Sequence, residues 1–282
     1  MSLTAVAKKD FTDARRSRSL WLLSALFVLF AAGMAWIYTE ITATGGAGAD
    51  PELSALGLYD FLASSATLFI SITALVIAHK AIAGERDSGS MKLLLGLPHS
   101  RADVLFGKVL GRAVTLALPI VLGMVVALGV IVALYDSYNL AEYAVFVSIT
   151  LVFALVYIGL MTAISASVST AGKASALAFA VFAVLELLWN AIPMGVLYVA
   201  NGFTLPGSIA EYPDWYFGIV SLTPSSAYQS ALTAVLDGAN TGATLTGRDA
   251  FYLEPWFGFV WLAFWLAVPL GIAYLRFDRA DL

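Results

Sequence analysis

The sequence predicts an all-α membrane protein with six transmembrane helices. Hydrophobic residues make up 60% of the 282 residues and charged residues only 12%, whereas a soluble domain carries about 25% charged residues. Mean hydropathy is +0.87. The apolar residues gather in six runs, each near the ~20 residues that cross a bilayer. These runs cover about 20–38, 60–78, 109–134, 142–166, 176–199 and 256–275. We expect a single transmembrane domain over residues 1–282.

Residues 1–19 predict an amphipathic helix that lies on the inner membrane surface. Apolar residues recur at helical spacing, and the charged residues fall on other parts of the helical wheel; the apolar set is Leu3, Val6, Ala7, Phe11 and Ala14. An unstructured basic flank is the alternative. Arg15-Arg16 also resembles the start of a cleaved signal peptide, but the following apolar run exceeds the 7–15 residues typical of one.

Residues 79–108 form the charged loop between the second and third spans. The stretch from Ala78 to Arg112 holds six of the fifteen Lys and Arg residues, and loops this basic stay on the cytoplasmic side. Further along, residues 200–255 form a long outer segment before the last span. Within it, 216–236 is apolar but interrupted by Thr223-Pro224, which favours a re-entrant helical hairpin over a seventh span.

The charges support this topology. The proposed inner segments hold 14 of the 15 basic residues, and only Arg248 lies on an outer segment. Such a split is hard to obtain with a wrong assignment of sides. We therefore expect a multi-pass protein of the plasma membrane with both termini in the cytoplasm.

Several kinds of chemistry have no signal in the sequence. There is no cysteine and there are two histidines, so thiolate metal sites are excluded. Gly202–Ser208 is the nearest match to a phosphate-binding loop and lacks its lysine. The basic residues are accounted for by the inner membrane face, which argues against nucleic-acid binding. We expect neither an enzyme nor a bound cofactor.

Three short motifs in the charged loop carry a resemblance. They are Glu85-Arg86-Asp87-Ser88-Gly89-Ser90, Leu97-Pro98-His99-Ser100-Arg101 and Phe106-Gly107-Lys108. Their order, within six spans and a basic N-terminal helix, resembles the loop between spans two and three of ABC-2 type transporter permeases. The resemblance covers most of the chain.

That resemblance implies a coupling helix in the loop, which docks on a cytosolic ABC ATPase. Glu85 and Arg86 would open the helix and Gly89 would permit close approach, while Leu97 and Pro98 would end the turn. Arg101, Gly107 and Lys108 would restart the chain at the third span. Two ATPase subunits carrying ATP–Mg would bind a homodimer or a heterodimer of paralogues. The alternative is that Leu93–Leu95 rests on the lipid surface and the charges are solvated. Gly107 and Gly111 also form a small-xxx-small pattern of the kind that packs helices closely.

Glu186 is the only ionisable residue deep in a predicted span, and Asn190 follows one turn later. Buried ionisable groups in membranes are costly and face a cavity or a partner. The pair either lines a substrate path or makes structural hydrogen bonds.

The main functional hypothesis is the permease subunit of an ATP-driven exporter. One alternative is a membrane anchor or assembly factor for metalloenzyme maturation, as in similar permeases that serve nitrous-oxide reductase. Another is a transporter driven by an ion gradient, which predicts several intramembrane ionisable residues where the sequence offers only Glu186.

Overall fold

The structure is a computed structural model that describes residues 3–16, 18–43, 55–91, 100–134, 138–236, 248 and 250–279. This part of the chain is helical, and it contains six helices long and apolar enough to cross a membrane. The predicted all-α architecture with six candidate spans is therefore confirmed.

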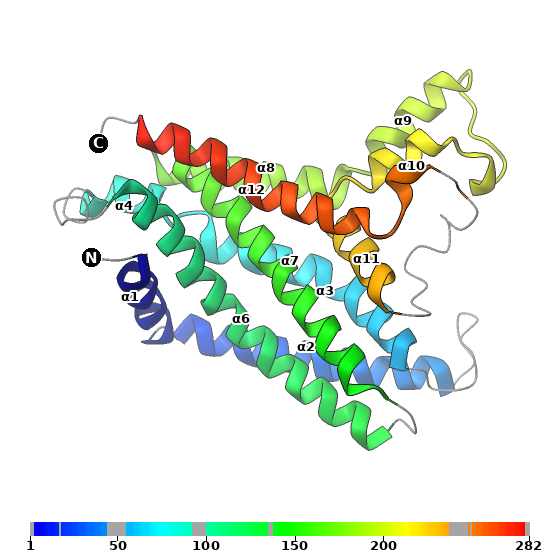
Figure 1. The fold of residues 1–282 in the computed structure, drawn as a ribbon, viewed down its shortest axis with the longest axis horizontal. Helices are drawn as coiled ribbons and strands as arrows, with labels where there is room; N and C mark the ends of the chain where they lie inside the picture. Colours follow the sequence, from blue (N-terminus) through cyan, green and yellow to red (C-terminus); the bar gives the residue numbers. More distant parts are fainter. Residues whose placement is uncertain are drawn as a thin grey trace.

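The six candidate spans run alternately up and down through one bundle (Figure 1). They are formed by α2 (Arg18–Ala43), α3 (Ala55–Ala78), α6 (Arg101–Leu134), α7 (Leu140–Ser167), α8 (Ala171–Phe182) with the π-helix η2 (Ala183–Leu188), and α12 (Phe257–Asp278). An even number of alternating spans brings the chain ends to the same end of the bundle, where α4 (Ala83–Asp87) also lies. We call this the basic end, because the described basic residues other than Arg248 lie toward it.

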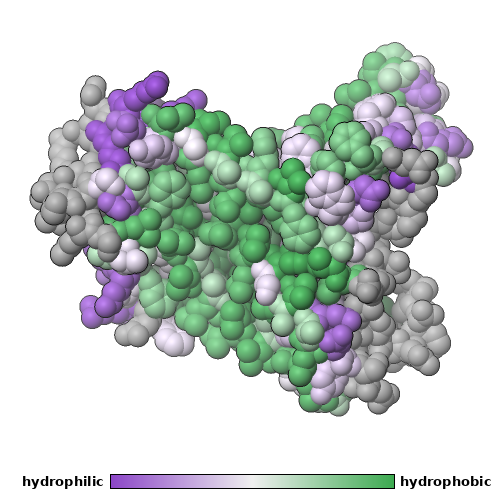
Figure 2. Space-filling view, viewed as in Figure 1, coloured by the Kyte–Doolittle hydropathy of each residue, from purple (hydrophilic) through white to green (hydrophobic). Residues whose placement is uncertain are grey.

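The surface has the pattern of a protein embedded in lipid. Apolar residues cover the middle of the bundle, and hydrophilic residues gather at the two ends (Figure 2). Large apolar side chains such as Leu29 and Val125 are mostly exposed on this band. An apolar surface of this size needs a cover, and lipid supplies it.

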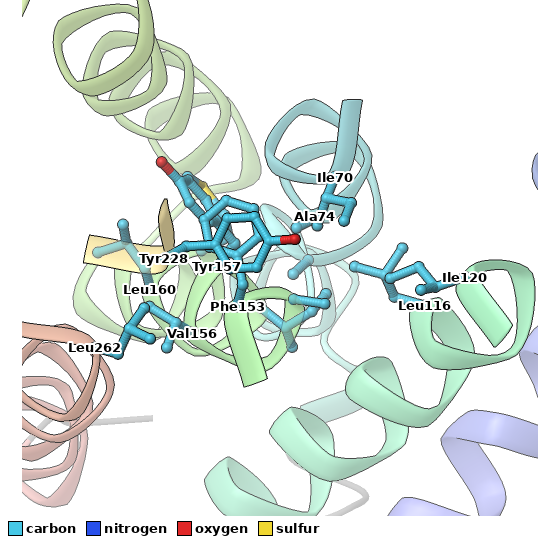
Figure 3. Close-up of a cluster of buried hydrophobic side chains, with 14 of the residues drawn as sticks. Ile70, Ala74, Leu116, Ile120, Phe153, Val156, Tyr157, Leu160, Tyr228 and Leu262 are labelled. Atoms are coloured by element: carbon cyan, nitrogen blue, oxygen red, sulfur yellow. The ribbon is translucent and has the colours of Figure 1, made fainter. Parts of the chain in front are cut away.

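Helix α7 is the centre of the bundle and the most buried candidate span. It packs against α3, α6, α8, α12 and a short helix, α11 (Pro224–Val235). The close-up in Figure 3 shows Phe153 and Tyr157 of α7 beside Tyr228 of α11. The rings of Phe153 and Tyr228 stack 4.6 Å apart, and the Tyr228 hydroxyl lies 2.8 Å from that of Thr150. The buried hydroxyls of Thr150 and Tyr228 thus have each other as partners.

The N-terminal helix α1 (Leu3–Arg16) packs against the start of α6. A Cβ on Gly107 would lie 2.7 Å from the Cβ of Val6, and one on Gly111 would lie 2.8 Å from the Cβ of Asp10. The small-xxx-small pattern therefore holds α1 against α6. That α1 also lies on a membrane surface stays a prediction.

The fifth span differs from the expected 176–199. The helix begins at Ala171, passes into the π-helix and is interrupted after Leu188. The apolar residues that follow form a separate helix, α9 (Ala191–Ala200), which projects from the bundle beside α10 (Asp214–Val220). Leu197 of α9 packs with Phe217 of α10 in a small second core. Periodicity alone could not show this break, because the segments on both sides of it are apolar.

Residues 216–236 form two short helices, as a helical hairpin requires. α10 ends at Val220, and α11 begins at Pro224 with Thr223 as its N-cap, whose hydroxyl accepts from the Ser226 amide at 3.1 Å. Proline at the first helical position and threonine at the cap favour a helix start here. Whether the hairpin re-enters the membrane stays a prediction.

Candidate functional site

The charged loop contains a one-turn helix, α4, that leads directly out of α3. Its first amide groups lack partners within the helix, as in any helix start. The hydroxyl of Ser165, fully buried in α7, accepts from the Ile82 amide at 3.1 Å and from the Ala83 amide at 3.0 Å. A side chain from the central span therefore caps α4. We call residues 83–91, α4 and the turn after it, the elbow.

Arg86 binds the elbow to the ends of two other spans. Its Nη1 donates to the carbonyl of Val168, after α7, at 2.8 Å, and its guanidinium lies 5.0 Å from the ring centroid of Phe277 in α12. Its Nε and Nη2 are buried without a hydrogen-bond partner among the described residues. Arg101 lies on the same ring and donates to the carbonyl of Asp278 at 2.9 Å. It thus satisfies a carbonyl that the helix end leaves unpaired.

Asp87 ties the elbow to α8. Its Oδ2 accepts from the Ala171 amide at 2.7 Å, and Thr170 accepts from the Lys173 amide at 3.3 Å. A carboxylate at a helix N-terminus is favoured by the helix dipole and by the unpaired amides. The first turn of α8 is therefore capped by the elbow and by its own threonine.

A buried ion cluster joins the elbow to α1 and α6. Lys108 is 4% exposed, and its Nζ lies 2.6 Å from Oε1 of Glu85 and 3.3 Å from Oδ1 of Asp10. Arg112 completes the cluster, with its Nε 2.8 Å from Oδ2 of Asp10 and its Nη1 donating to the carbonyl of Ile77 at 3.2 Å. Lysine is almost never this buried unless its charge is paired. The cluster holds two carboxylates and two basic side chains, so its formal charges cancel.

The turn after α4 is the exposed part of the elbow. Gly89 has φ +72°, a left-handed conformation that favours glycine, and the flanking Ser88 and Ser90 are exposed. Their hydroxyls lie 2.9 Å apart and both donate toward the carbonyl of Glu85 at 3.3 Å. Leu97 and Pro98 lie outside the described residues.

Glu186 belongs to a second polar cluster, toward the other end of the bundle. Its Oε1 accepts hydrogen bonds from the hydroxyl of Tyr157 in α7 and, at 2.6 Å, from that of Ser225 in the first turn of α11. Trp189 donates to the carbonyl of Ile219 at 2.8 Å, so the same stretch also holds α10. Asn190 is exposed and does not join the cluster. The π-helix ends at Leu188 and Asn190 lies in the turn that follows, so Glu186 and Asn190 do not belong to one continuous helix.

The comparison with protein families shows to which family the chain belongs. A family model described as ABC-2 family transporter protein matches residues 4–282. The chain belongs to this family. It is therefore an ABC transporter permease, as the resemblance of the charged loop predicted. A permease subunit of this kind is not normally itself catalytic.

Two curated relatives resemble the permease over almost its whole length. Both are called probable ABC transporter permease protein NosY, one from Stutzerimonas stutzeri and one from Pseudomonas aeruginosa. Each is 27% identical, over 280 and 278 residues respectively, and each match covers 97% of both chains.

The structure brings most of the predicted coupling residues of the permease together, but in two roles. Contacts of Glu85, Arg86 and Lys108 fix the position of the elbow, and Arg101 binds the end of α12 beside it. Gly89 lies on the exposed turn. Gly107 lies beneath α1 rather than on the outer surface.

Other residues of the site escaped the sequence analysis. Asp10, Ser165 and Phe277 complete it from positions distant in the chain. Of these three, only Asp10 is recognisable in the sequence, as an acidic residue within a basic helix. Serine and phenylalanine are too common in apolar spans to indicate a site.

Proposed function

We propose that this permease is the membrane subunit of an ATP-driven exporter, powered by a separate cytosolic ABC ATPase that docks on the elbow. ATP–Mg binds to the ATPase, and the permease supplies the path across the plasma membrane. Two permease chains, identical or paralogous, pair with two ATPase subunits. In this arrangement the basic end and both termini face the cytoplasm, in accord with the positive-inside rule.

The observation that carries the proposal is the way the elbow is fastened. Four helices contact the elbow directly, through Ser165 of α7, Ala171 of α8, Phe277 of α12 and Lys108 of α6. A fifth helix, α1, contacts it indirectly, because Asp10 binds Lys108. Polar and ionic contacts of this kind have a defined geometry, so a displacement of the elbow moves the ends of these helices with it. The exposed turn at Ser88–Ser90 is left for the ATPase.

The positive charge of Arg86 and Arg101 suits an ATPase surface that offers hydrogen-bond acceptors. Two of its nitrogen atoms are buried and unpartnered among the described residues, and Arg101 lies on the same aromatic ring. Buried polar groups without a partner cost free energy. If docking uncovers these atoms, a carboxylate or carbonyl from the ATPase would remove that cost.

Glu186 serves either as part of the substrate path or as a fixed point for the outer hairpin. Its two hydrogen bonds, from Tyr157 and Ser225, join span five to span four and to α11. Motion of either span would therefore move the hairpin. Asn190, exposed beside it, remains a candidate for contact with substrate or with the second permease chain.

Two glycines allow a controlled test of docking. Gly89 on the elbow and Gly202 at the opposite end both have positive φ, +72° and +69°, and a Cβ would meet no atom within 4 Å at either. Valine is strained at positive φ. Gly89→Val should abolish co-purification of an ATP-binding subunit and the ATPase activity that the permease stimulates in nanodiscs. Gly202→Val should leave both within about twofold of wild type, since its backbone change lies far from the elbow.

The same experiment separates the rival functions. A protein that moves substrate with an ion gradient needs no ATPase, and an assembly factor need not stimulate one. If wild-type permease captures no ATP-binding subunit, or if Gly89→Val keeps full ATPase stimulation, the coupling role of the elbow is wrong.

A further inference from the structure

A hollow of about 630 Å³ opens at the basic end, between the last turn of α7 and the last two turns of α12. Its lining consists of Ser167, Ile272, Leu275, Arg276 and Arg279. The volume lies within the range of small-ligand sites, ~300–1,000 Å³. It is separate from the elbow cluster, and the proposed function does not use it.

The two arginines are the distinctive feature of this hollow. Arg276 and Arg279 are three residues apart on α12, a spacing that places side chains side by side on one helix face. Neither makes a hydrogen bond or ion pair with another described residue, whereas Arg86, Arg101, Lys108 and Arg112 are all bound to internal groups. Two neighbouring guanidinium groups are thus available to one anion, and guanidinium binds phosphate oxygens in a bidentate manner.

The end of α12 is held in place, so the arginines are presented from a fixed position. Arg101 of α6 donates to the carbonyls of Phe277 and Asp278, and the ring of Phe277 is fully buried under Arg86. These contacts fall between Arg276 and Arg279 in sequence, on the face that points into the bundle. The hydroxyl of Ser167 already donates to the Ala163 carbonyl at 2.8 Å, so charge recognition rests on the arginines.

The apolar part of the hollow continues into the lipid-facing surface. Phe264, Val268 and Ile272 lie four residues apart on α12 and are 42%, 39% and 49% exposed, and Arg276 is the next residue in this row. An exposed apolar row that ends in paired cations has the order of a phospholipid, with tails along the row and the phosphate at its end. Basic pockets at the cytoplasmic ends of spans bind anionic head groups in this way.

We propose that the hollow binds an anionic phospholipid of the inner leaflet, its phosphodiester between Arg276 and Arg279 and its acyl chains along Ile272, Val268 and Phe264. A cytosolic protein would gain little from the exposed apolar row, and a free phosphate would make no use of it. The choice of leaflet rests on the orientation in the proposed function. The binding itself does not, because it can be measured on permease without ATPase.

The test is native mass spectrometry of delipidated permease titrated with phosphatidylglycerol, and with phosphatidylcholine of the same chains. Wild type should bind phosphatidylglycerol roughly tenfold more tightly than phosphatidylcholine, because the paired guanidinium groups meet a net negative head group. Arg276→Gln with Arg279→Gln should remove that preference. The control, Lys80→Gln with Lys173→Gln, removes two exposed charges from the same end and should keep it. Arg276→Lys with Arg279→Lys, which retains the charge, should fall between the two.

Three results would overturn the proposal. One is unchanged phosphatidylglycerol binding by the double glutamine variant with native tryptophan fluorescence. Another is equal binding of the two lipids by wild type, which would mean apolar contact alone. The third is displacement of phosphatidylglycerol by millimolar inorganic phosphate, which would mark a site for a free anion. Since none of these measurements involves ATP hydrolysis, the lipid site and the coupling role can fail separately.

Discussion

At the scale of single residues, Lys108 links the elbow to α1 at the basic end of the molecule. It is 4% exposed and shares its ammonium group between Glu85 of the elbow and Asp10 of α1. Removing one partner from a buried ion pair leaves an uncompensated charge, which costs far more than the intact pair contributes. The cluster therefore makes the position of the elbow depend on that of α1.

Replacing Lys108 with Met should destabilise the permease by roughly 3–5 kcal/mol, because Glu85 then loses its ion pair and Asp10 keeps only Arg112. The measurement is the thermal unfolding midpoint in detergent. Adding Glu85→Gln should recover much of the loss, since the unpaired charge on the elbow is removed. The control is Lys80→Met, an exposed lysine of the same end. Equal midpoints for Lys108→Met and Lys80→Met would contradict a structural role for the cluster.

Glu186 makes a second residue-scale prediction. Its hydrogen bond from Ser225 fixes the first turn of α11, and a hydrogen bond to a charged or strongly polar group contributes about 1.5–3 kcal/mol. Glu186→Ala should raise hydrogen–deuterium exchange at the amides of residues 225–228 by roughly tenfold or more. Asn190→Ala, four residues away and exposed, should leave that exchange at the wild-type rate. Similar exchange in the two variants would mean that the hairpin is held by its apolar contacts alone.

At the scale of elements, close helix crossings depend on glycine. A Cβ on Gly258 of α12 would lie 2.4 Å from the Ala227 carbonyl oxygen and 2.5 Å from the Ala231 amide of α11. These atoms belong to the backbone and cannot move aside as a side chain can. The hairpin can therefore lie this close to the last span because Gly258, in the first turn of α12, has no Cβ.

Gly258→Ala should destabilise the permease by about 1–3 kcal/mol, as overpacking does elsewhere. Gly271→Ala, on the same helix with no atom within 4 Å of its Cβ, should be neutral or slightly stabilising because alanine favours helix. Thermal unfolding in detergent measures both. A cysteine pair on α11 and α12, in a chain with no natural cysteine, should also lose cross-linking in Gly258→Ala. Equal unfolding midpoints for Gly258→Ala and Gly271→Ala would mean that α11 and α12 are not packed as closely as the structure shows.

At the scale of the whole molecule, the unequal distribution of charge sets the orientation. The basic end carries every described Lys and Arg except Arg248, which is held at the other end by Asp214 at 2.6 Å and by the ring of Phe217. Positively charged segments resist translocation. The basic end should therefore remain in the cytoplasm.

Cysteine labelling tests the orientation directly. Lys173→Cys, exposed at the basic end, should react with an impermeant maleimide only in inside-out vesicles, and Ser208→Cys, exposed at the other end, only in right-side-out vesicles. The wild-type chain supplies the blank, since it has no cysteine. Labelling of Lys173→Cys from outside intact cells would place the elbow in the wrong compartment.

The sequence by itself determined the class of molecule, the six candidate spans and the place of the charged loop. Each follows from quantities that are summed along the chain: apolar length, the count of basic residues per segment, and short motifs in order. Glu186 also stood out, because an acid in an apolar run is costly wherever the run lies.

Only the tertiary structure decided which of these residues touch. The sequence placed Asn190 with Glu186, but the helix ends at Leu188, Asn190 is exposed in the turn that follows, and Tyr157 and Ser225 bind the carboxylate instead. It placed Lys108 on a loop, but α1 covers that lysine with Asp10 from 98 residues away. Hydrogen bonds and ion pairs act over a few ångströms between segments distant in the chain, so no pattern along the chain records them.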